Sequence, residues 1–444
     1  MGMRIRSRYL IAVLIVLSLF SLALTAVIVF RPVEIFSYNG LTRNVASTNQ
    51  DNSTQARVNY ALEDVFRPTR FVYSYENKVK MTSDSTIIES VNNALVGKYK
   101  EIGKREVLSQ ENYEQLVLRD SFSQLLFDAP VTFSIISRYF ADVPEEFRQE
   151  TFSRIIYRYD DSKSVYFVND YTKQLYQAKI DQDVQTEFSK FYEEDKFYLV
   201  ESYILKHKQV FIEVNNLSLE KQTYLMEQIP ISFYITQLFA NPSELRNRSD
   251  GQSIIYNDNL SQLKMDRSTN VISYYQNRVD DEPLSLTVHL QQSFAQMKKI
   301  GGWKLGMSFS DFDTERKIVE YMRYVGSYPI LSDAKEGFSQ FIITLTGVEK
   351  MRLSSLIAET PIPAKNQKID LMSGKELMDQ ILGKGISLST LEDIRLGYAW
   401  KSSPESNQIV EFLPNWYIKV DGNWRTLEEL NQPLKDQGGD SDGF

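Results

Sequence analysis

Two histidines are the residues of this 444-residue chain best suited to acid–base or metal chemistry. His207 and His289 both fall in segments with the composition of β-strands, and no other histidine is present. They lie far apart, without the His-x-x-x-His or His-x-His spacing that brings two imidazoles to one metal ion. The chain also has no cysteine, which excludes cysteine nucleophiles and cysteine-based metal sites. The sequence therefore predicts no metal site.

Paired carboxylates are the second candidate, because two of them across a cleft suffice for glycoside hydrolysis. The pairs are Asp160 and Asp161, Asp280 and Asp281, and Asp311 and Asp313. All three fall at predicted turns, where an aspartate commonly hydrogen-bonds nearby backbone amides. The chain also lacks a Gly-x-Ser-x-Gly nucleophile elbow and the glycine-rich loops that hold phosphates. We therefore expect no enzyme activity, no catalytic residue and no cofactor.

Aromatic side chains are the third chemical feature, because tyrosine and tryptophan present broad amphipathic rings that could stack on glycans. The candidates are Tyr171, Tyr176, Tyr274, Tyr275, Trp303, Trp400, Trp416 and Trp424. The same rings are also common on half-buried sheet faces, which is the interpretation we favour. A cell-surface glycan-binding or wall-processing protein remains the second functional hypothesis.

Charge and composition restrict the partners. Lysine and arginine number 50 against 58 aspartates and glutamates, which gives a net charge of −8 and a pI near 5.2. Phosphate binding needs a basic face, so a nucleic-acid partner is not expected. The charged fraction of 24% and the aromatic fraction of 12% are typical of folded globular material.

An uncharged run from Tyr9 to Phe30 must position everything that follows. Its 22 residues would form a helix of roughly 33 Å, enough to cross a bilayer. Arg4, Arg6 and Arg8 precede the run and favour a cytoplasmic N-terminus, with the bulk of the chain outside. A cleaved signal peptide is the alternative, but the run is longer than a usual h-region and lacks a small-x-small cleavage pattern. The sequence thus predicts an uncleaved anchor.

One face of this span could contact another membrane helix. Leu14, Ser18, Ser21 and Thr25 share that face, and Ser21-x-x-x-Thr25 is a small-xxx-small pair that allows close helix approach. Hydroxyls are also tolerated in lone anchors, where they bond to carbonyls of their own helix. The sequence leaves both interpretations open, and the partner-helix interface is a hypothesis.

The predicted fold class is α+β, with one N-terminal transmembrane helix and an extracytoplasmic region of mostly antiparallel sheets with packed helices. The predicted segments are a cytoplasmic tail at 1–8, the anchor at 9–30, a stalk or linker at 31–65, α+β domains at 66–200, 201–305 and 306–432, and a disordered tail at 433–444.

Local signals predict individual elements of this region. The spacing of apolar residues predicts a helix over Glu315–Tyr324, and composition predicts a strand over Ser285–Leu290. Ser373 to Glu376 forms a capping-box sequence at the start of another helix. A three-strand meander is expected over 394–420, followed by a hairpin turn at Asp421-Gly422.

Several of these parts occur together in one known family. They are the basic N-terminus, the span, the Asn/Ser-rich stalk, the strand-Pro-x-x-Phe segment at 125–133, the Tyr324–Pro329 stretch, the Ser373–Glu376 helix start and the closing Val410–Trp416 and Asp421–Trp424 segments. In this order they resemble the YycH (WalH) family over nearly the whole chain. The polar tail beyond Gln432 departs from it.

The resemblance implies an extracytoplasmic accessory protein of Gram-positive bacteria. Members of this family act with the related YycI on WalK, the sensor histidine kinase of the WalK/WalR (YycG/YycF) two-component system that controls cell-wall metabolism. They do so in part through membrane-helix contacts, and they have an α+β multidomain fold without known catalytic residues. The terminal meander also looks like PepSY-type modules. We therefore expect a membrane-anchored, non-enzymatic regulator.

Overall fold

The computed structural model describes residues 61–431, with gaps at 76–77, 120, 182, 193–194, 279–282, 301–305, 332–335, 364–366 and 405. The predicted cytoplasmic tail, the span, the stalk up to residue 60 and the tail from 433 lie outside this part. Within it, no helix is long and apolar enough to cross a membrane. The described residues belong to one compact unit, Val58–Phe444. The boundaries expected at 200 and 305 remain predictions.

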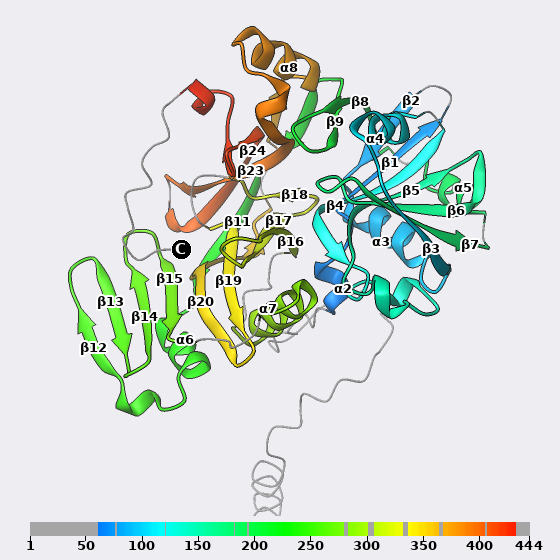
Figure 1. Ribbon diagram of the computed structural model, residues 1–444. Helices are drawn as coiled ribbons and strands as arrows, with labels where there is room; N and C mark the ends of the chain where they lie inside the picture. Colours follow the sequence, from blue (N-terminus) through cyan, green and yellow to red (C-terminus); the bar gives the residue numbers. More distant parts are fainter. Residues whose placement is uncertain are drawn as a thin grey trace, which may run out of the picture. The chain divides into compact units, whose positions relative to one another are not determined.

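The first sheet has nine strands in the order β3-β7-β6-β5-β4-β1-β2-β8-β9, and neighbouring strands are antiparallel (Figure 1). The strands are β1 (Arg70–Tyr75), β2 (Lys78–Thr82), β3 (Tyr99–Val107), β4 (Phe122–Thr132), β5 (Thr151–Arg158), β6 (Asp161–Val168), β7 (Gln174–Ile180), β8 (Tyr198–Ile204) and β9 (Gln209–Glu213). Both faces are covered, since Phe71 and Tyr73 of β1 enter one core and Val72 enters another.

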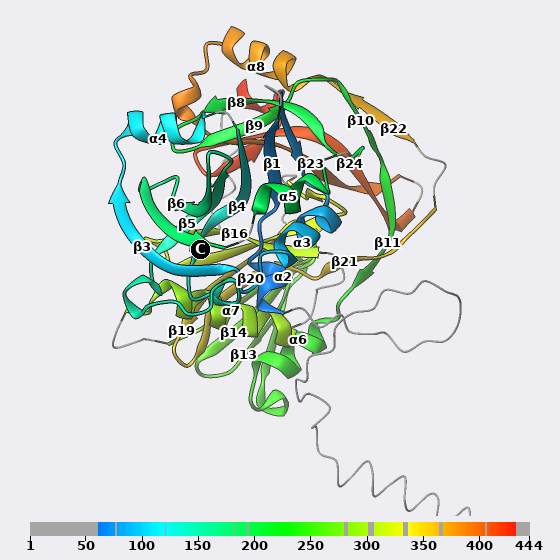
Figure 2. The same cartoon turned by 90° about the vertical axis from the view of Figure 1, so that its right-hand side faces the viewer.

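Capped helices cover these two faces. They are α3 (Ser85–Asn93), α4 (Gln110–Val117) and α5 (Val184–Ser189), preceded in the chain by the short α2 (Leu62–Val65). The carboxylate of Asp84 accepts from two amides at the start of α3, and the hydroxyl of Ser109 does the same for one amide of α4. Helices α3 and α5 pack into the core that contains Phe71 (Figure 2), whereas α4 packs into the core that contains Val72.

The second sheet follows the order β12-β13-β14-β15-β20-β19-β17-β16, with β18 paired to β17. Its strands are β12 (Arg246–Ser249), β13 (Ser253–Asn257), β14 (Ser261–Asp266), β15 (Val271–Gln276), β16 (Gly306–Asp313), β17 (Ile318–Val325), β18 (Tyr328–Pro329), β19 (Phe338–Thr344) and β20 (Gly347–Ser354). Helices α6 (Ile231–Leu238) and α7 (Leu286–Ile300) pack against it. Phe66 lies against Phe309 of β16 and Phe294 of α7, so the second sheet shares a continuous core with the first.

Two local predictions in this sheet are wrong. The helix expected over Glu315–Tyr324 is strand β17, which is buried along both faces, so its apolar residues also fit a helical spacing by chance. The strand expected over Ser285–Leu290 is the start of α7, whose β-branched residues suggested a strand. Leu290, Phe294 and Met297 follow at helical spacing and are buried against the second sheet.

A third sheet combines β11 with C-terminal strands in the order β21-β11-β24-β23, with β25 on β24; β10 and β22 form a separate pair. The elements of this region are β10 (Leu217–Glu220), β11 (Gln222–Gln228), β21 (Leu356–Pro361), β22 (Lys368–Leu371), α8 (Gly374–Gly383), β23 (Leu391–Ser403), β24 (Ser406–Val420) and β25 (Asn423–Arg425). Short 3₁₀ segments of the described chain lie at Ser137–Tyr139, Glu145–Phe147, Pro242–Glu244, Leu388–Thr390 and Glu429–Asn431.

Most signals in this region are confirmed. The Ser373 hydroxyl accepts from the Glu376 amide at 3.1 Å, and the Glu376 carboxylate accepts from the Ser373 amide at 3.0 Å, which is the expected capping box. Asp421 and Gly422 have φ of 50° and 75°, as the tight turn between β24 and β25 requires. The three-strand meander expected over 394–420 is wrong in its strand number. That range holds only β23 and β24, because β24 continues through Pro414 as one strand where the sequence suggested two.

Candidate functional site

The site residues expected from sequence fall in different places. The span face of Leu14, Ser18, Ser21 and Thr25 lies outside the described residues. His207 lies in the turn between β8 and β9, where burial lowers its pKa.

His289 lies in α7 rather than in a strand. Its side chain is buried, with the ring centroid 5.2 Å from that of Phe312. The two histidines therefore belong to different parts of the fold, in agreement with their separation in the sequence.

The candidate carboxylates that the structure describes are engaged by cations or hydroxyl groups. The partners are Arg158 and Arg119 for Asp160, the Tyr166 hydroxyl for Asp161, Lys419 for Asp311, and Arg316 for Asp313. Asp311 lies inside β16 rather than at a turn. The pair at 280–281 lies outside the described residues.

The candidate aromatic platform is mostly buried. Tyr176, Tyr274, Trp400 and Trp416 are core residues. Tyr171 and Tyr275 are exposed, but one precedes β7 of the first sheet and the other lies in β15 of the second. Trp303 lies outside the described residues, and Trp424 packs on the guanidinium of Arg395, 5.0 Å from the ring centroid.

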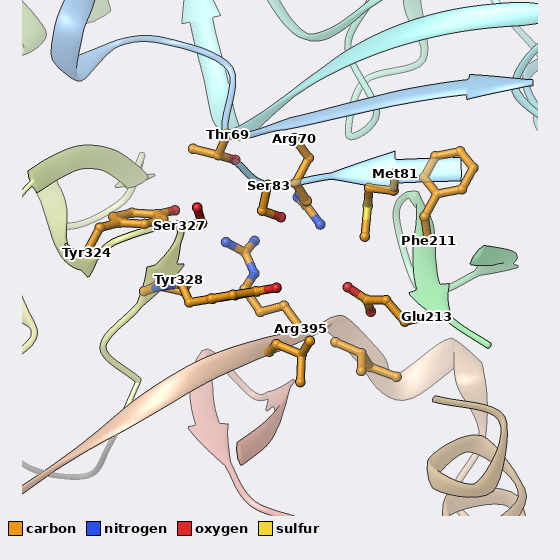
Figure 3. A pocket seen from close by; sticks show the side chains of 13 residues that line it. Thr69, Arg70, Met81, Ser83, Phe211, Glu213, Tyr324, Ser327, Tyr328 and Arg395 are labelled. Atoms are coloured by element: carbon orange, nitrogen blue, oxygen red, sulfur yellow. The ribbon is translucent and has the colours of Figure 1, made fainter. Parts of the chain in front are cut away.

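A cavity of about 30 Å³ is lined by residues from all three large sheets. Arg70 and Met81 come from β1 and β2, Glu213 from β9, and Tyr328 from β18; Arg395 comes from β23 of the third sheet. Figure 3 shows the side chains of Arg70, Arg395, Glu213 and Tyr328 converging from different sides. The volume is sufficient for a compact polar group or a few waters.

Asp128 links the three sheets beside this cavity. It lies in an irregular stretch of β4, where the pairing with β5 shifts between Leu126 and Val131. Its carboxylate accepts from Thr69 at 2.8 Å, from Tyr324 of β17 at 2.5 Å and from Arg395 of β23 at 2.8 Å.

The charge of Asp128 is stabilised where it is buried. Burial alone would raise the pKa of this carboxyl group, but Arg395 and Arg70 together with the two hydroxyl donors hold the pKa below its ordinary value. The carboxylate thus stays ionised and joins elements of all three sheets.

Asp393 forms the second half of the charged cluster. Its carboxylate accepts from Lys208 at 2.9 Å and from two nitrogens of Arg395. Burial opposes ionisation, but Arg395 and Lys208 lower the pKa of Asp393 far below its ordinary value. The Arg395 guanidinium therefore lies between two carboxylates, which fixes its orientation at the cavity wall.

Two networks hold β9 and hence Glu213 in place. At the start of the strand, the buried guanidinium of Arg154 donates to the side chain and the carbonyl of Gln209, and also to Asp170. At its end, helix α8 packs so closely that a Cβ at Gly374 would lie 2.5 Å from the Glu213 carbonyl oxygen. Glycine is therefore required at this contact.

Glu213 itself is 5% exposed, and burial raises the pKa of its carboxyl group to about 7. Arg70 acts in the opposite direction, although no ion pair joins the two side chains among the described residues. Glu213 is therefore a buried acid that changes its charge near neutral pH.

This shift predicts a pH dependence of stability. Between pH 4.5 and about 7 the folded chain holds a proton on Glu213 that the unfolded chain has lost, so stability falls as pH rises through this window. The loss amounts to about 3 kcal/mol, at about 1.4 kcal/mol per pH unit. Glu213→Gln removes this loss. Urea unfolding of the full chain in detergent measures this effect. Between pH 4.5 and pH 7.5, the free energy of unfolding of the variant should rise by about 3 kcal/mol relative to that of wild type.

The matched control is Glu101→Gln, at an exposed carboxylate paired with Lys179. Its difference from wild type should stay constant over the same range. A constant difference for Glu213→Gln as well would contradict the buried, protonated state of Glu213.

This charged cluster could hardly be predicted from the sequence. The residues of the cluster lie far apart in the sequence, and each lies in a strand or directly beside one. Asp128 lies within β4, which continues to Thr132 past the irregular stretch. The one available signal was a charged residue between apolar neighbours, as in Ile394-Arg395-Leu396.

Comparison with known proteins is consistent with this architecture. The family model described as YycH protein, C-terminal domain, matches residues 207–433, slightly more than half of the chain. The crystal structure of YycH from Bacillus subtilis is similar with a TM-score of 0.67 and 14% identity, over 83% of this chain and 98% of that chain. At this identity the likeness concerns the fold.

Two further solved structures are only weakly similar to this chain. An uncharacterized protein from Eubacterium rectale ATCC 33656 has a TM-score of 0.30 and 10% identity, over 51% of this chain and 88% of that chain. The YpeB C-terminal domain of Bacillus megaterium has a TM-score of 0.23 and 12% identity, over 45% and 91% of the respective chains. No curated protein matches the sequence.

Proposed function

The chain belongs to the YycH family, and on this premise we propose that it is a membrane-anchored extracytoplasmic regulator of a WalK-type sensor histidine kinase that controls cell-wall metabolism. It acts with a YycI-type partner, through its transmembrane helix and its outer domains. Its N-terminus is cytoplasmic, and residues after the span face the outside of a Gram-positive cell.

The observation that carries this proposal is the family match over residues 207–433. The mostly antiparallel, multi-sheet fold, which resembles that of Bacillus subtilis YycH, supports it. The uncharged run at 9–30 supports the anchor, and the flanking arginines support its orientation.

A non-enzymatic role is part of the proposal. Beside the cavity, Arg395 is committed to Asp128 and Asp393. The candidate carboxylates are likewise held by neighbouring cations and hydroxyls. These arrangements favour a binding and scaffolding protein over a hydrolase.

The coupling element in this proposal is the span, and its hydroxyl face provides a test. Replacing Ser18, Ser21 and Thr25 together by leucine should leave insertion intact. It should lower recovery of the kinase in detergent co-purification by about tenfold, because close helix packing and interhelical hydrogen bonds are lost.

The matched control places three leucines on the opposite face, as Val16→Leu, Ala23→Leu and Val27→Leu. This control should recover the kinase as wild type does. Equal recovery of the kinase with both triple variants would show that the hydroxyl face does not bind the kinase and that the span is a plain anchor.

A further inference from the structure

The cavity contains a buried cation that the rest of the described structure does not satisfy. Arg70 is 8% exposed, and its closest carboxylate contact, Nη2 to Asp128, is 3.7 Å long, beyond hydrogen-bond distance. Its Nε is buried without a hydrogen-bond partner among the described residues. A buried guanidinium in this state is costly unless a further acceptor reaches it.

A buried acid faces the same space. Glu213 lies on β9 and Arg70 on β1, and Figure 3 shows the two side chains directed into the cavity from different strands. The cavity separates them, since no nitrogen–oxygen contact within 4.0 Å joins them in the described part of the chain. The hydroxyl-bearing residues Ser83, Ser327 and Tyr328 also line the space.

The surrounding charges leave a positive excess. Arg70, Lys208 and Arg395 supply three positive charges, whereas Asp128 and Asp393 supply two negative charges, so one positive charge is uncompensated while Glu213 is protonated. An anion in the cavity would compensate this charge in a region of low dielectric, where such an interaction is strong.

We propose that this cavity binds a small oxyanion, such as a carboxylate, sulfate or phosphate group, which accepts hydrogen bonds from the Arg70 guanidinium and from the side chain of Glu213. Arg70 supplies the charge and the donors that planar oxyanion recognition requires. The small volume suits a compact oxyanion group. Arg395 contributes positive potential from the cavity wall, where its two carboxylates hold it.

Anion binding is linked to proton binding at Glu213. Arg70 of β1 acts on this acid, and Tyr198 of β8 and Tyr328 of β18 lie near it; the tyrosines remain neutral because burial raises their pKa. Asp84, at the start of α3, acts on both tyrosines and is paired with Lys196. Glu376, on the adjacent helix α8, is engaged by the Ser373 cap. Ionised Glu213 would place a second anion beside the ligand, so affinity falls as pH rises through about 7.

Binding of an anion in the cavity does not require the kinase. Anion binding is measured on the chain alone, so its failure and a failure of partner association are separate results.

The test is calorimetric titration of the full chain in detergent with sodium sulfate, at constant ionic strength, with chloride as the reference anion. Sulfate does not titrate between pH 6 and pH 8, so any pH dependence belongs to the protein. Wild type should bind sulfate about tenfold more tightly at pH 6 than at pH 8, the ratio expected for an acid with a pKa near 7. Arg70→Gln should weaken binding at pH 6 by about tenfold or more.

Two further variants keep the test decisive if Arg70→Gln folds poorly. Glu213→Gln retains a donor but cannot ionise, so its affinity should be equal at the two pH values. Arg119→Gln removes an exposed arginine of the same sheet region, and should behave as wild type. Titrations with acetate and inorganic phosphate at pH 6 then rank the carboxylate and phosphate forms of the ligand.

Three results would overturn the proposal. They are absence of sulfate binding beyond that of chloride at pH 6, wild-type affinity in a folded Arg70→Gln variant, and pH dependence that persists in Glu213→Gln.

Discussion

Asp128→Asn is expected to lower the free energy of unfolding by about 3–5 kcal/mol, because it leaves buried cations without their carboxylate. Asp128 accepts hydrogen bonds from Thr69, Tyr324 and Arg395, which belong to or adjoin three different sheets. Asparagine keeps the shape but removes the charge, and adds a second uncompensated positive charge to the cluster around the cavity. Urea unfolding of the full chain in detergent at pH 7 measures the loss.

The pH dependence gives this prediction a second readout. Since the folded pKa of Asp128 lies below its ordinary value, the carboxylate stabilises the fold above that ordinary value. The stabilisation is lost as pH falls through the folded pKa. The difference between wild type and Asp128→Asn should therefore shrink in acid.

The matched control is Asp160→Asn, which removes a carboxylate paired with Arg158 and Arg119 at the surface. Half-exposed pairs of this kind contribute about 1 kcal/mol or less. If Asp128→Asn were no more destabilising than this control, Asp128 could not be a stabilising link between the sheets.

The sequence predicted those elements whose signals are local. The capping box at Ser373 and Glu376 and the turn at Asp421-Gly422 depend on residues within four positions of each other, and both are present. The antiparallel, multi-sheet character also followed from short strands separated by turn residues.

The sequence pattern led to a wrong prediction where a strand is buried on both faces, because such a strand lacks a simple alternation of apolar and polar residues. Ile318, Tyr321 and Met322 fit one side of a helix, but β17 has buried residues on both of its faces. Conversely, Thr287 and Val288 suggested a strand at the start of α7, and the packing of the full 15-residue helix outweighs that local preference.

The cavity could not be predicted, because its chemistry depends on tertiary structure. Arg70, Glu213 and Arg395 lie in strands of different regions, and nothing in their spacing shows that they converge. The only local sign of the cavity was that charged residues stand between apolar neighbours in the sequence. The charge pairing that makes this burial tolerable is visible only once the sheets are assembled.

Exchange of the span is expected to abolish association with the kinase. Exchanging residues 9–30 for an unrelated apolar helix of equal length should reduce co-purification of the WalK-type kinase to background, while the chain still inserts with its N-terminus inside. The reason is that the proposed coupling depends on side-chain packing between membrane helices, whereas insertion depends only on length and hydrophobicity. Protease accessibility on intact cells verifies that the exchanged chain keeps its orientation.

The same co-purification distinguishes a span that couples to the kinase from a plain anchor. The full chain and the span-exchanged chain are expressed at equal levels with the kinase and a YycI-type partner, extracted in detergent and recovered through the chain. The full chain should recover the kinase, and the exchanged chain should not. Undiminished recovery of the kinase by the exchanged chain, together with binding of wall glycan by the part outside the membrane, would contradict it.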